Sequence, residues 1–245
     1  MNPFDKTEDP RRRLLIQALA AGMFSGGLPG GRALAADILG NTPSKLPPGQ
    51  SIYRVSGPVT VNGAAANMKT RIGPSDTVET GKGGEIVFAV GESAFLLREG
   101  SRMVLASPRK DSMLISALRL VGGKLLSVFP KGKQPKSITT ATATMGIRGT
   151  GVYLEADPQQ TYFCTCYGVA EVVANKDPQS KETVVSTHHD KPLYIVADGK
   201  PGQNIRSAPF INHTDQELTL IETLVGRKPP FVFPKDGYKA PRRDY

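Results

Sequence analysis

The sequence lacks tryptophan, and among its 245 residues only two are cysteine and three histidine. It also lacks an apolar run of the roughly 18–20 residues that a membrane-spanning helix needs. Its hydrophobic fraction of 39% is ordinary for a globular chain. These features argue against an integral membrane protein and against disorder throughout. Glycine and proline are abundant, with 26 and 20 residues, which favours many short strands joined by turns over a helical bundle.

Positive charge is in excess, with 31 Lys and Arg against 22 Asp and Glu and a formal net charge of +9. No block of five or more basic residues occurs, and Tyr and Phe are not interleaved with basic residues as in a base-stacking platform. We therefore expect no nucleic-acid partner. A basic surface suits anionic wall polymers, lipid head groups or an acidic protein, so the expected partner is an envelope protein or a cell-wall component.

Residues 1–35 have the three parts of an export signal. Residues 11–13 are three arginines, residues 14–24 form a short apolar stretch, and residues 33–35 read Ala-Leu-Ala. The arginine pair, followed by Arg-Leu-Leu, resembles a twin-arginine signal, and an ordinary Sec signal is the alternative. Cleavage after Ala35 would leave a periplasmic protein of residues 36–245 without a transmembrane anchor.

The body of the chain is predicted to be all-β. Residues 36–50 read as a linker, because three prolines fall within the last ten of them. Strand-like runs separated by glycine turns then recur at 57–61, 85–90, 94–98, 102–106, 121–128 and 151–155. Asn62-Gly63 and Glu99-Gly100 are typical of hairpin turns. We expect one β domain over 51–200, either a β-sandwich or a short β-helix-like stack of strands.

One helix is predicted in the C-terminal segment 201–245, from about Asp215 to Val225. Thr214 and Glu217 have the spacing of a capping box, and Gly226 supplies the stop. Apolar residues at 218, 221 and 225 form one stripe along this helix. The proline-rich, charged tail after residue 229 is expected to be extended.

Four segments resemble the FecR domain, an all-β periplasmic module known from regulators of extracytoplasmic sigma factors. They are GPVTVNG (57–63), the long segment 71–106, LRLVGGKLLSV (118–128) and TTATATMGIRGT (139–150). The resemblance covers about residues 51–175, and the matching positions are Gly73, Asp76, Thr80, Gly81, Gly100, Ser101 and residues 146–150. It implies a binding or signal-relaying scaffold with no catalytic residues to carry over.

The chain departs from the family regulators at its start. Those regulators carry a cytoplasmic segment that binds the sigma factor and then a membrane helix, whereas an export signal occupies that place here. The resemblance therefore does not extend to a direct anti-sigma role, and only the domain is retained.

The segment TTATATMGIRGT lacks the G-K-[ST] ending of a phosphate loop, so we interpret it as structural. Alternating Thr and Ala predict a strand with one hydroxyl face. Gly146 and Gly149 then suit bulges or corners, and Arg148 suits a clamp on backbone carbonyls. Thr150 completes this structural motif.

Every thiol and imidazole of the chain falls within one window of 50 residues: Cys164, Cys166, His188, His189 and His213. Such clustering hints at a metal site. Residues two apart on a strand project from the same face, and their Cα spacing lies at the outer limit for a disulfide. Two leaning sulfurs can, however, share a zinc-like ion. All five are candidate ligands for zinc, iron or copper, with a strained disulfide as the alternative for the cysteines.

The three histidines differ in how well they suit this site. His188 and His189 should face opposite sides of a regular strand, so at most one joins the cysteines unless the chain turns at His189-Asp190. Asp190 is a candidate acceptor that could orient either imidazole. His213 precedes the helix cap, and its alternative role is half-exposed packing against the first turn.

The sequence offers little support for catalysis. A nucleophile pair can be drawn from Cys166 and His189, but no strand-turn-helix elbow or oxyanion loop accompanies it. Paired carboxylates for hydrolysis are also missing. We expect a non-enzymatic binding, scaffold or signalling module of the cell envelope. The alternative is a metal-binding or redox-sensing periplasmic protein that uses Cys164, Cys166 and the histidines.

Overall fold

The computed structural model describes residues 43–107, 113–132 and 135–231. The expected export signal, residues 36–42 of the expected linker and the tail beyond residue 231 lie outside these ranges. In the part of the chain that is described, no helix has both the length and the apolar character needed to span a bilayer.

The described residues form strands and one helix, as predicted. The first strands are β1 (Ile52–Ser56), β2 (Val59–Val61), β3 (Ala64–Ala65), β4 (Thr77–Thr80), β5 (Glu85–Val90), β6 (Ser93–Leu97) and β7 (Arg102–Ala106). The later elements are β8 (Ala117–Val128), β9 (Lys136–Thr139), β10 (Ala143–Ala156), β11 (Gln160–Ala174), β12 (Asp177–Ser186), β13 (Leu193–Val196), β14 (Ile205–Ser207) and α3 (Asp215–Leu224). Because β14 pairs with β13, the sheet continues past residue 200, where the domain was expected to end.

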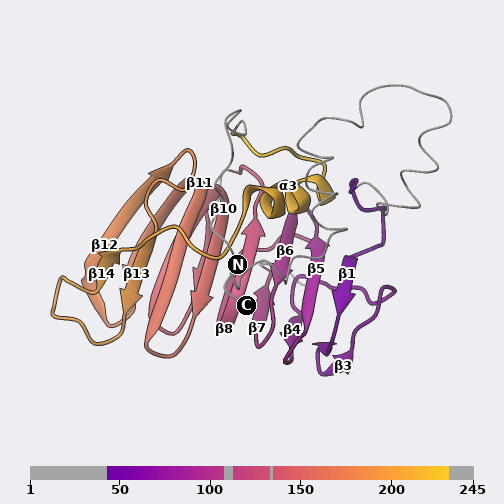
Figure 1. Cartoon of the computed structure of the whole chain (residues 1–245), viewed down its shortest axis with the longest axis horizontal. Helices are drawn as coiled ribbons and strands as arrows, with labels where there is room; N and C mark the ends of the chain where they lie inside the picture. Colours follow the sequence, from indigo (N-terminus) through magenta and orange to yellow (C-terminus); the bar gives the residue numbers. More distant parts are fainter. Residues whose placement is uncertain (1–42, 108–112, 133–134, 232–245) are drawn as a thin grey trace, which may run out of the picture. The chain divides into compact units, whose positions relative to one another are not determined.

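All strands of the described residues belong to one open sheet (Figure 1). Its three longest strands, β8, β10 and β11, each change partners midway. β8 pairs first with β7 and then with β6. β10 pairs first with β9 and then with β8, while β11 pairs first with β13 and then with β12. The sheet therefore divides into two arms. The helix-side arm contains β1, β5, β6, β13, β14, the second halves of β8 and β10, and the first half of β11; the far arm contains the rest.

The main hydrophobic core lies between the two arms. Phe88 and Phe95 of the helix-side arm stack with ring centroids 5.1 Å apart. They belong to the same buried cluster as Val78 and Met103 of the far arm, and all four side chains are inaccessible to solvent. Two arms that face each other across one core give a sandwich, which was one of the two predicted arrangements.

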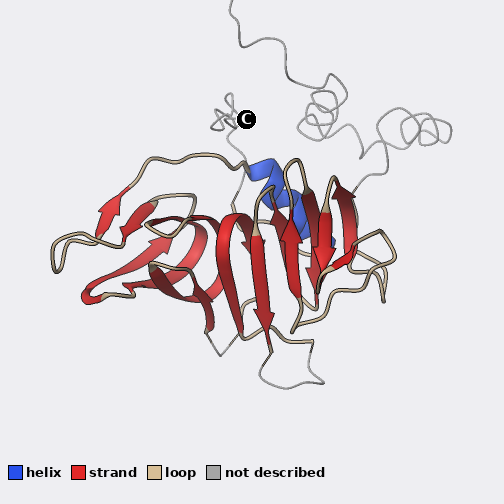
Figure 2. Ribbon diagram, turned by 90° about the horizontal axis from the view of Figure 1, so that it is seen from below, coloured by secondary structure: helices blue, strands red, loops and turns tan. Residues whose placement is uncertain are grey.

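The helix α3 covers the outer face of the helix-side arm (Figure 2). Leu218 and Ile221 are fully buried there, against a second apolar cluster that includes Val87, Leu96 and Leu126. The predicted capping box is present, because the Thr214 side chain accepts from the backbone of Glu217 and the Glu217 side chain accepts from the backbone of Thr214. The predicted helix is thus confirmed, with Leu224 as its last residue.

One of the two predicted hairpins is wrong. Asn62 and Gly63 both have positive φ, 52° and 81°, and join β2 to β3 as expected. Gly100 also has a positive φ of 63°, but β6 and β7 do not pair with each other. Each pairs instead with a different half of β8, so the Glu99-Gly100 turn carries the chain from one arm to the other.

The TTATAT segment is two strands with a break between them, not one strand. β9 ends at Thr139 and β10 begins at Ala143. At the break, the hydroxyls of Thr140 and Thr142 lie 2.7 and 2.8 Å from the hydroxyl of Thr161, and Thr142 also donates to the Ile195 carbonyl. Buried hydroxyls normally have hydrogen-bond partners, and here the threonines on the two sides of the break and Thr161 satisfy one another.

The expectations for the following motif hold only in part. Gly149 has a φ of 58° and lies in a register shift between β10 and β11, as expected for a bulge. Gly146 stays in regular register opposite Glu171 and is no bulge. The side chain of Arg148 is exposed and forms no hydrogen bond with the described residues, so no clamp on their backbone carbonyls is present. Thr150 is fully buried beside the bulge.

The bulge predicts a specific sensitivity at Gly168, which faces it with a φ of +97°. A Cβ there would lie 2.5 Å from Thr150 Cγ2 and 2.8 Å from the Gly149 carbonyl oxygen. We expect Gly168→Ala to lower the free energy of unfolding by at least about 1–2 kcal/mol, measured by urea titration. The matched control is Gly122→Ala, whose Cβ would be 3.7 Å from the nearest atom. Equal losses for both variants would contradict this account.

Candidate metal centre

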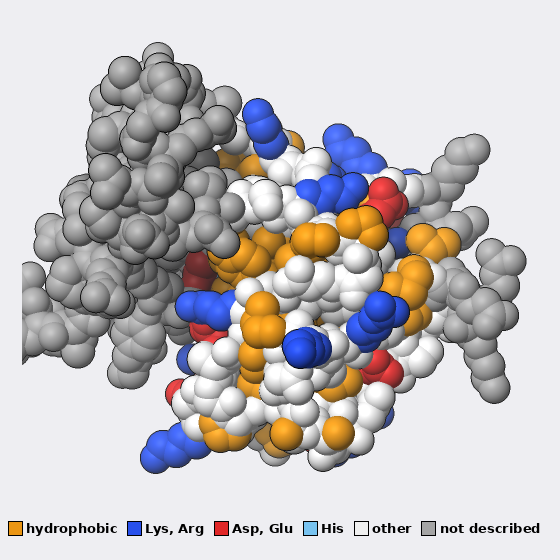
Figure 3. Space-filling model, turned by 90° about the vertical axis from the view of Figure 1, so that its right-hand side faces the viewer, with side chains coloured by type: hydrophobic (Ala, Val, Ile, Leu, Met, Phe, Trp, Pro, Cys, Tyr) orange, Lys and Arg blue, Asp and Glu red, His pale blue; other side chains and the backbone are white. Residues whose placement is uncertain are grey.

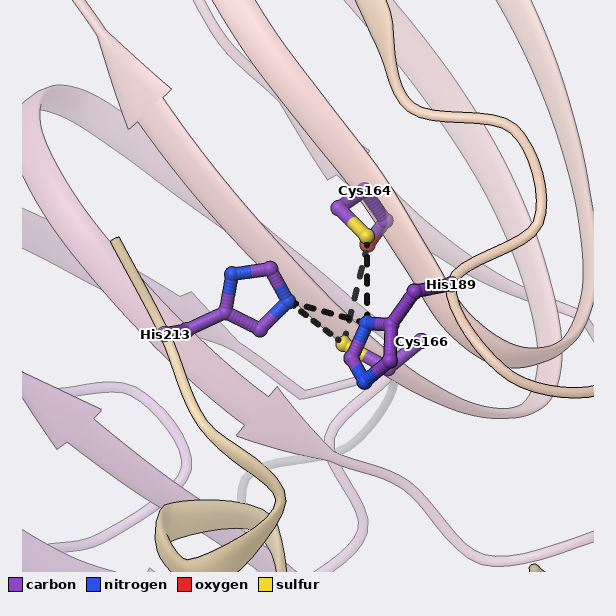
Figure 4. A group of neighbouring side chains, drawn as sticks. All are labelled: Cys164, Cys166, His189 and His213. Carbon is purple, nitrogen blue, oxygen red and sulfur yellow. Dashed lines mark hydrogen bonds between the residues drawn. The ribbon is translucent and has the colours of Figure 1, made fainter. Parts of the chain in front are cut away.

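Four of the five candidate ligands meet in one buried cluster (Figure 4). Cys164 and Cys166 lie on β11, and their sulfurs share the face of the helix-side arm that α3 covers. His189 comes from the turn after β12, and His213 from the segment just before α3. His189 is 8% exposed and the other three are fully buried.

Three of the six ligand–ligand distances in this cluster are close to the edge lengths of a tetrahedral zinc site, and the ligand atoms all lie within 4.8 Å of one another. Cys164 Sγ lies 3.4 Å from His189 Nδ1, Cys166 Sγ lies 3.4 Å from His213 Nε2, and the two nitrogens are 3.1 Å apart. Zinc bonds of about 2.3 Å to sulfur and about 2.0–2.1 Å to nitrogen give S–N edges of about 3.6 Å and N–N edges of about 3.3 Å. The observed edges are therefore within a few tenths of an ångström of those around a zinc ion.

Both imidazoles are held from behind by acceptors. His189 Nε2 lies 2.9 Å from Asp215 Oδ1, and His213 Nδ1 lies 2.7 Å from the Ile211 carbonyl oxygen. Because these partners accept hydrogen bonds, each ring donates outward and turns its other nitrogen toward the sulfurs. This is how metal-binding histidines are usually oriented.

His188 takes a different place from His189. Its Nε2 lies 2.8 Å from Asp215 Oδ2, so one carboxylate contacts both adjacent imidazoles. His189 has a left-handed φ of 55°, which turns the chain where a regular strand would separate the two rings. His189 is therefore the one of the pair that joins the cysteines.

The acceptor expected from the sequence, Asp190, does not contact an imidazole nitrogen. Its Oδ2 accepts from the backbone of Thr187 and His188 and from the Thr187 hydroxyl, and so holds the turn. Asp215 takes the expected role and was missed. Its sequence signal is its position two residues from His213, but an acidic residue in the first turn of a helix is explained equally well by the helix dipole.

Aromatic rings close the centre from the sides. The His213 ring stacks on the Tyr153 ring, with their centroids 4.4 Å apart. The centroid of the Phe210 ring lies 4.2 Å from that of His189 and 4.7 Å from that of His213. His213 is consequently inaccessible to solvent. The half-exposed packing role that the sequence offered for this residue is therefore wrong. Electrostatic interactions are strong in such a dry setting.

Burial and close contact lower the pKa values of Cys164 and His213 and raise those of Cys166 and His189. Burial raises the pKa of the Cys164 thiol, but hydrogen bonds with Cys166, His189 and His213 outweigh it and hold that pKa well below its usual value. Burial and the neighbouring Cys164 raise the pKa of Cys166 well above its usual value. Burial lowers the pKa of His189, but Asp215 and Cys164 raise it to about 9, whereas burial leaves the pKa of His213 lowered.

A buried ion pair fixes the segment that carries His213. Arg98 is 8% exposed, and its Nη2 lies 3.0 Å from Glu217 Oε2. Its Nη1 donates to the Tyr153 hydroxyl at 2.9 Å and to the Asn212 carbonyl. The residues on both sides of His213 are thus tied to the helix-side arm.

We expect Glu217→Gln to lower the free energy of unfolding by on the order of 3 kcal/mol, because it leaves a buried guanidinium without its charged partner. Gln retains the capping box, so the loss reports the charge. The control is Glu79→Gln, since the Glu79–Arg102 pair has side chains 38% and 57% exposed and should lose less than about 1 kcal/mol. Chemical denaturation of both variants checks this, and similar losses would refute it.

No protein-family model and no curated protein matches the chain. Two crystal structures of a proposed anti-sigma factor from Parabacteroides distasonis ATCC 8503 are similar to it. The structure at 1.65 Å resolution has a TM-score of 0.42 and 13% identity, covering 54% of this chain and 58% of that one. The structure at 2.50 Å has a TM-score of 0.43 and 14% identity, covering 69% and 84%. Scores of this size assign neither a fold family nor a function.

Proposed function

We propose that this chain is a metal-binding protein in which Cys164, Cys166, His189 and His213 hold one zinc-like ion. The observation that supports the proposal is the burial of two thiols and two imidazoles whose ligand atoms lie within 4.8 Å of one another, with three neighbouring pairs at 3.4, 3.4 and 3.1 Å. Four protein ligands leave no open position for a substrate, which is characteristic of a structural zinc site and not of a catalytic one.

The same distances favour a single ion over an iron–sulfur cluster. In a two-iron cluster with two cysteines and two histidines, the thiolates and imidazoles bind different irons. Sulfur and nitrogen atoms only 3.4 Å apart suit ligands of the same ion. Two thiolates with two imidazoles suit zinc, and iron or copper are the other candidates by ligand type.

The ion would join three segments that are distant in the sequence. The cysteines lie in the middle of the sheet, His189 lies in a turn, and His213 lies at the start of the segment that packs on the outer face. An ion that binds the folded chain but not the unfolded chain raises the free energy of unfolding, and this gain grows with the logarithm of the metal concentration. The ion would thus hold the helix α3 against the sheet.

We propose further that the β domain is a non-enzymatic binding or signalling module of the cell envelope. The FecR-like segments between residues 51 and 175 and the signal-like residues 1–35 support this. Lys and Arg side chains are spread over the face seen in Figure 3 and are not gathered in one patch, which suits an extended anionic partner. Twin-arginine export, which carries folded proteins, suits a chain that acquires its ion before it crosses the membrane.

The metal proposal predicts about one equivalent of a transition metal in the full chain purified without a histidine tag, measured by elemental analysis. Cobalt reconstitution should give a thiolate-to-cobalt absorption band, which Cys164→Ser and Cys166→Ser should each greatly weaken. Affinity should fall as the pH is lowered, because protons compete for the thiolates. Less than about a tenth of an equivalent, together with a complete Cys164–Cys166 disulfide, would contradict the proposal.

A second variant tests the orienting carboxylate. Asp215→Asn should weaken metal binding by about 10–100-fold, because the Asp215 carboxylate holds the His189 ring. Asp198→Asn, a charge-matched change in the turn after β13, should leave affinity unchanged. Equal affinity in both variants would show that Asp215 has no part in the site.

The export proposal predicts that Arg11→Lys combined with Arg12→Lys leaves the precursor in the cytoplasm. Fractionation and immunoblotting of precursor and mature forms provide the measurement. Unchanged export would favour the Sec route, and an uncleaved membrane-bound product would oppose a periplasmic location altogether.

A further inference from the structure

His189 has one ring nitrogen in each of two clusters. Its Nδ1 faces the sulfurs, while its Nε2 faces Asp215 together with the His188 Nε2. The ligand atoms of His188, His189 and Asp215 lie within 4.8 Å of one another. We propose that these three residues form a second metal site, in which the His189 ring bridges an inner and an outer ion. This inference rests on the inner site proposed above.

The outer ligand set differs from the inner one in chemistry. It offers two imidazole nitrogens and a carboxylate oxygen, which suit divalent zinc, copper, nickel or cobalt, and it contains no sulfur. The His188 side chain is 34% exposed, whereas the side chains of His189 and Asp215 are 4% and 0% exposed. Three protein ligands beside solvent leave a position for water, as in sites that exchange ligands or catalyse reactions.

The backbone prepares this set before an ion arrives. The left-handed φ of 55° at His189 is uncommon for a residue other than glycine, and it aims two adjacent rings at one carboxylate. Asp190 holds the turn through the amides of Thr187 and His188. The His188 ring also lies 4.5 Å from Phe231 and 4.8 Å from the His189 ring. Ligands whose geometry is already fixed lose little conformational freedom on binding.

The charges of a two-ion centre balance. The two thiolates neutralise the inner divalent ion, and the outer ion is neutralised by Asp215 and by the His189 ring after its last N–H proton passes to solvent. No electron is transferred. A centre without net charge lowers the cost of burying two cations. With one ion only, that proton stays between His189 Nε2 and Asp215, and the carboxylate merely orients the ring.

The experiment counts ions in the full chain equilibrated with excess Co²⁺ under reducing conditions and then separated from free metal. We expect two equivalents of cobalt in the wild type and one in His188→Ala. The thiolate-to-cobalt band, which reports the inner ion alone, should be unchanged in this variant. The control Lys191→Ala, an exposed neighbour in the same turn region, should keep two equivalents.

Each of the other outcomes overturns either the outer site or the proposed function. One equivalent in both wild type and His188→Ala, with the band present, refutes the outer site and leaves the inner site standing. Two equivalents in both place the second ion elsewhere and also refute the outer site. A wild type that binds no ion and shows no band refutes the proposed function itself. If His188→Ala does not fold by circular dichroism, His188→Gln removes the imidazole with less loss of volume and is scored in the same way.

Discussion

A guanidinium is buried between the sheet and the helix, and the site depends on the hydrogen bonds and the ion pair that this group forms. Arg98 pairs with Glu217 and donates to Tyr153 and to the Asn212 carbonyl. Glu217 also closes the capping box of α3, so the pair fixes the start of the helix as well as its distance from the sheet. His213, between Asn212 and that cap, is placed over the sulfurs as a consequence.

Much of the fold could be predicted from the sequence because its signals are local. The helix α3 and the bounds of β5 and β7 follow from capping residues, apolar periodicity and glycine turns. The choice of strand partners is not local. Glu99-Gly100 has the composition of a hairpin turn, yet β6 and β7 pair with different halves of β8 because the sheet folds over there. Nothing in those two residues distinguishes a hairpin from a crossing between arms.

In the candidate site, too, the features set by local sequence could be predicted and those set by tertiary packing could not. The period-2 rule predicts that Cys164 and Cys166 share a face, and composition alone groups them with the histidines. The contact of both His188 and His189 with Asp215 depends on one left-handed residue and on where the helix packs. These are tertiary facts, and the adjacent Asp190 was the better candidate by proximity in the sequence. Tyr153 and Phe210 carry no motif that marks them as walls of a site.

The position of the cysteines in the middle of a paired strand makes their spacing intolerant of insertion. One extra residue between Cys164 and Cys166 would turn one sulfur to the opposite face, into the core between the arms. The turn between β13 and β14, residues 197–204, contains no residue of the site, and Arg98 anchors the chain at Asn212, just before His213, so this turn can change in length without moving His213. Chains that share this site should therefore keep one residue between the two cysteines, whereas the number of residues between the two ligand histidines should vary. A search pattern that fixes both spacings would miss such chains.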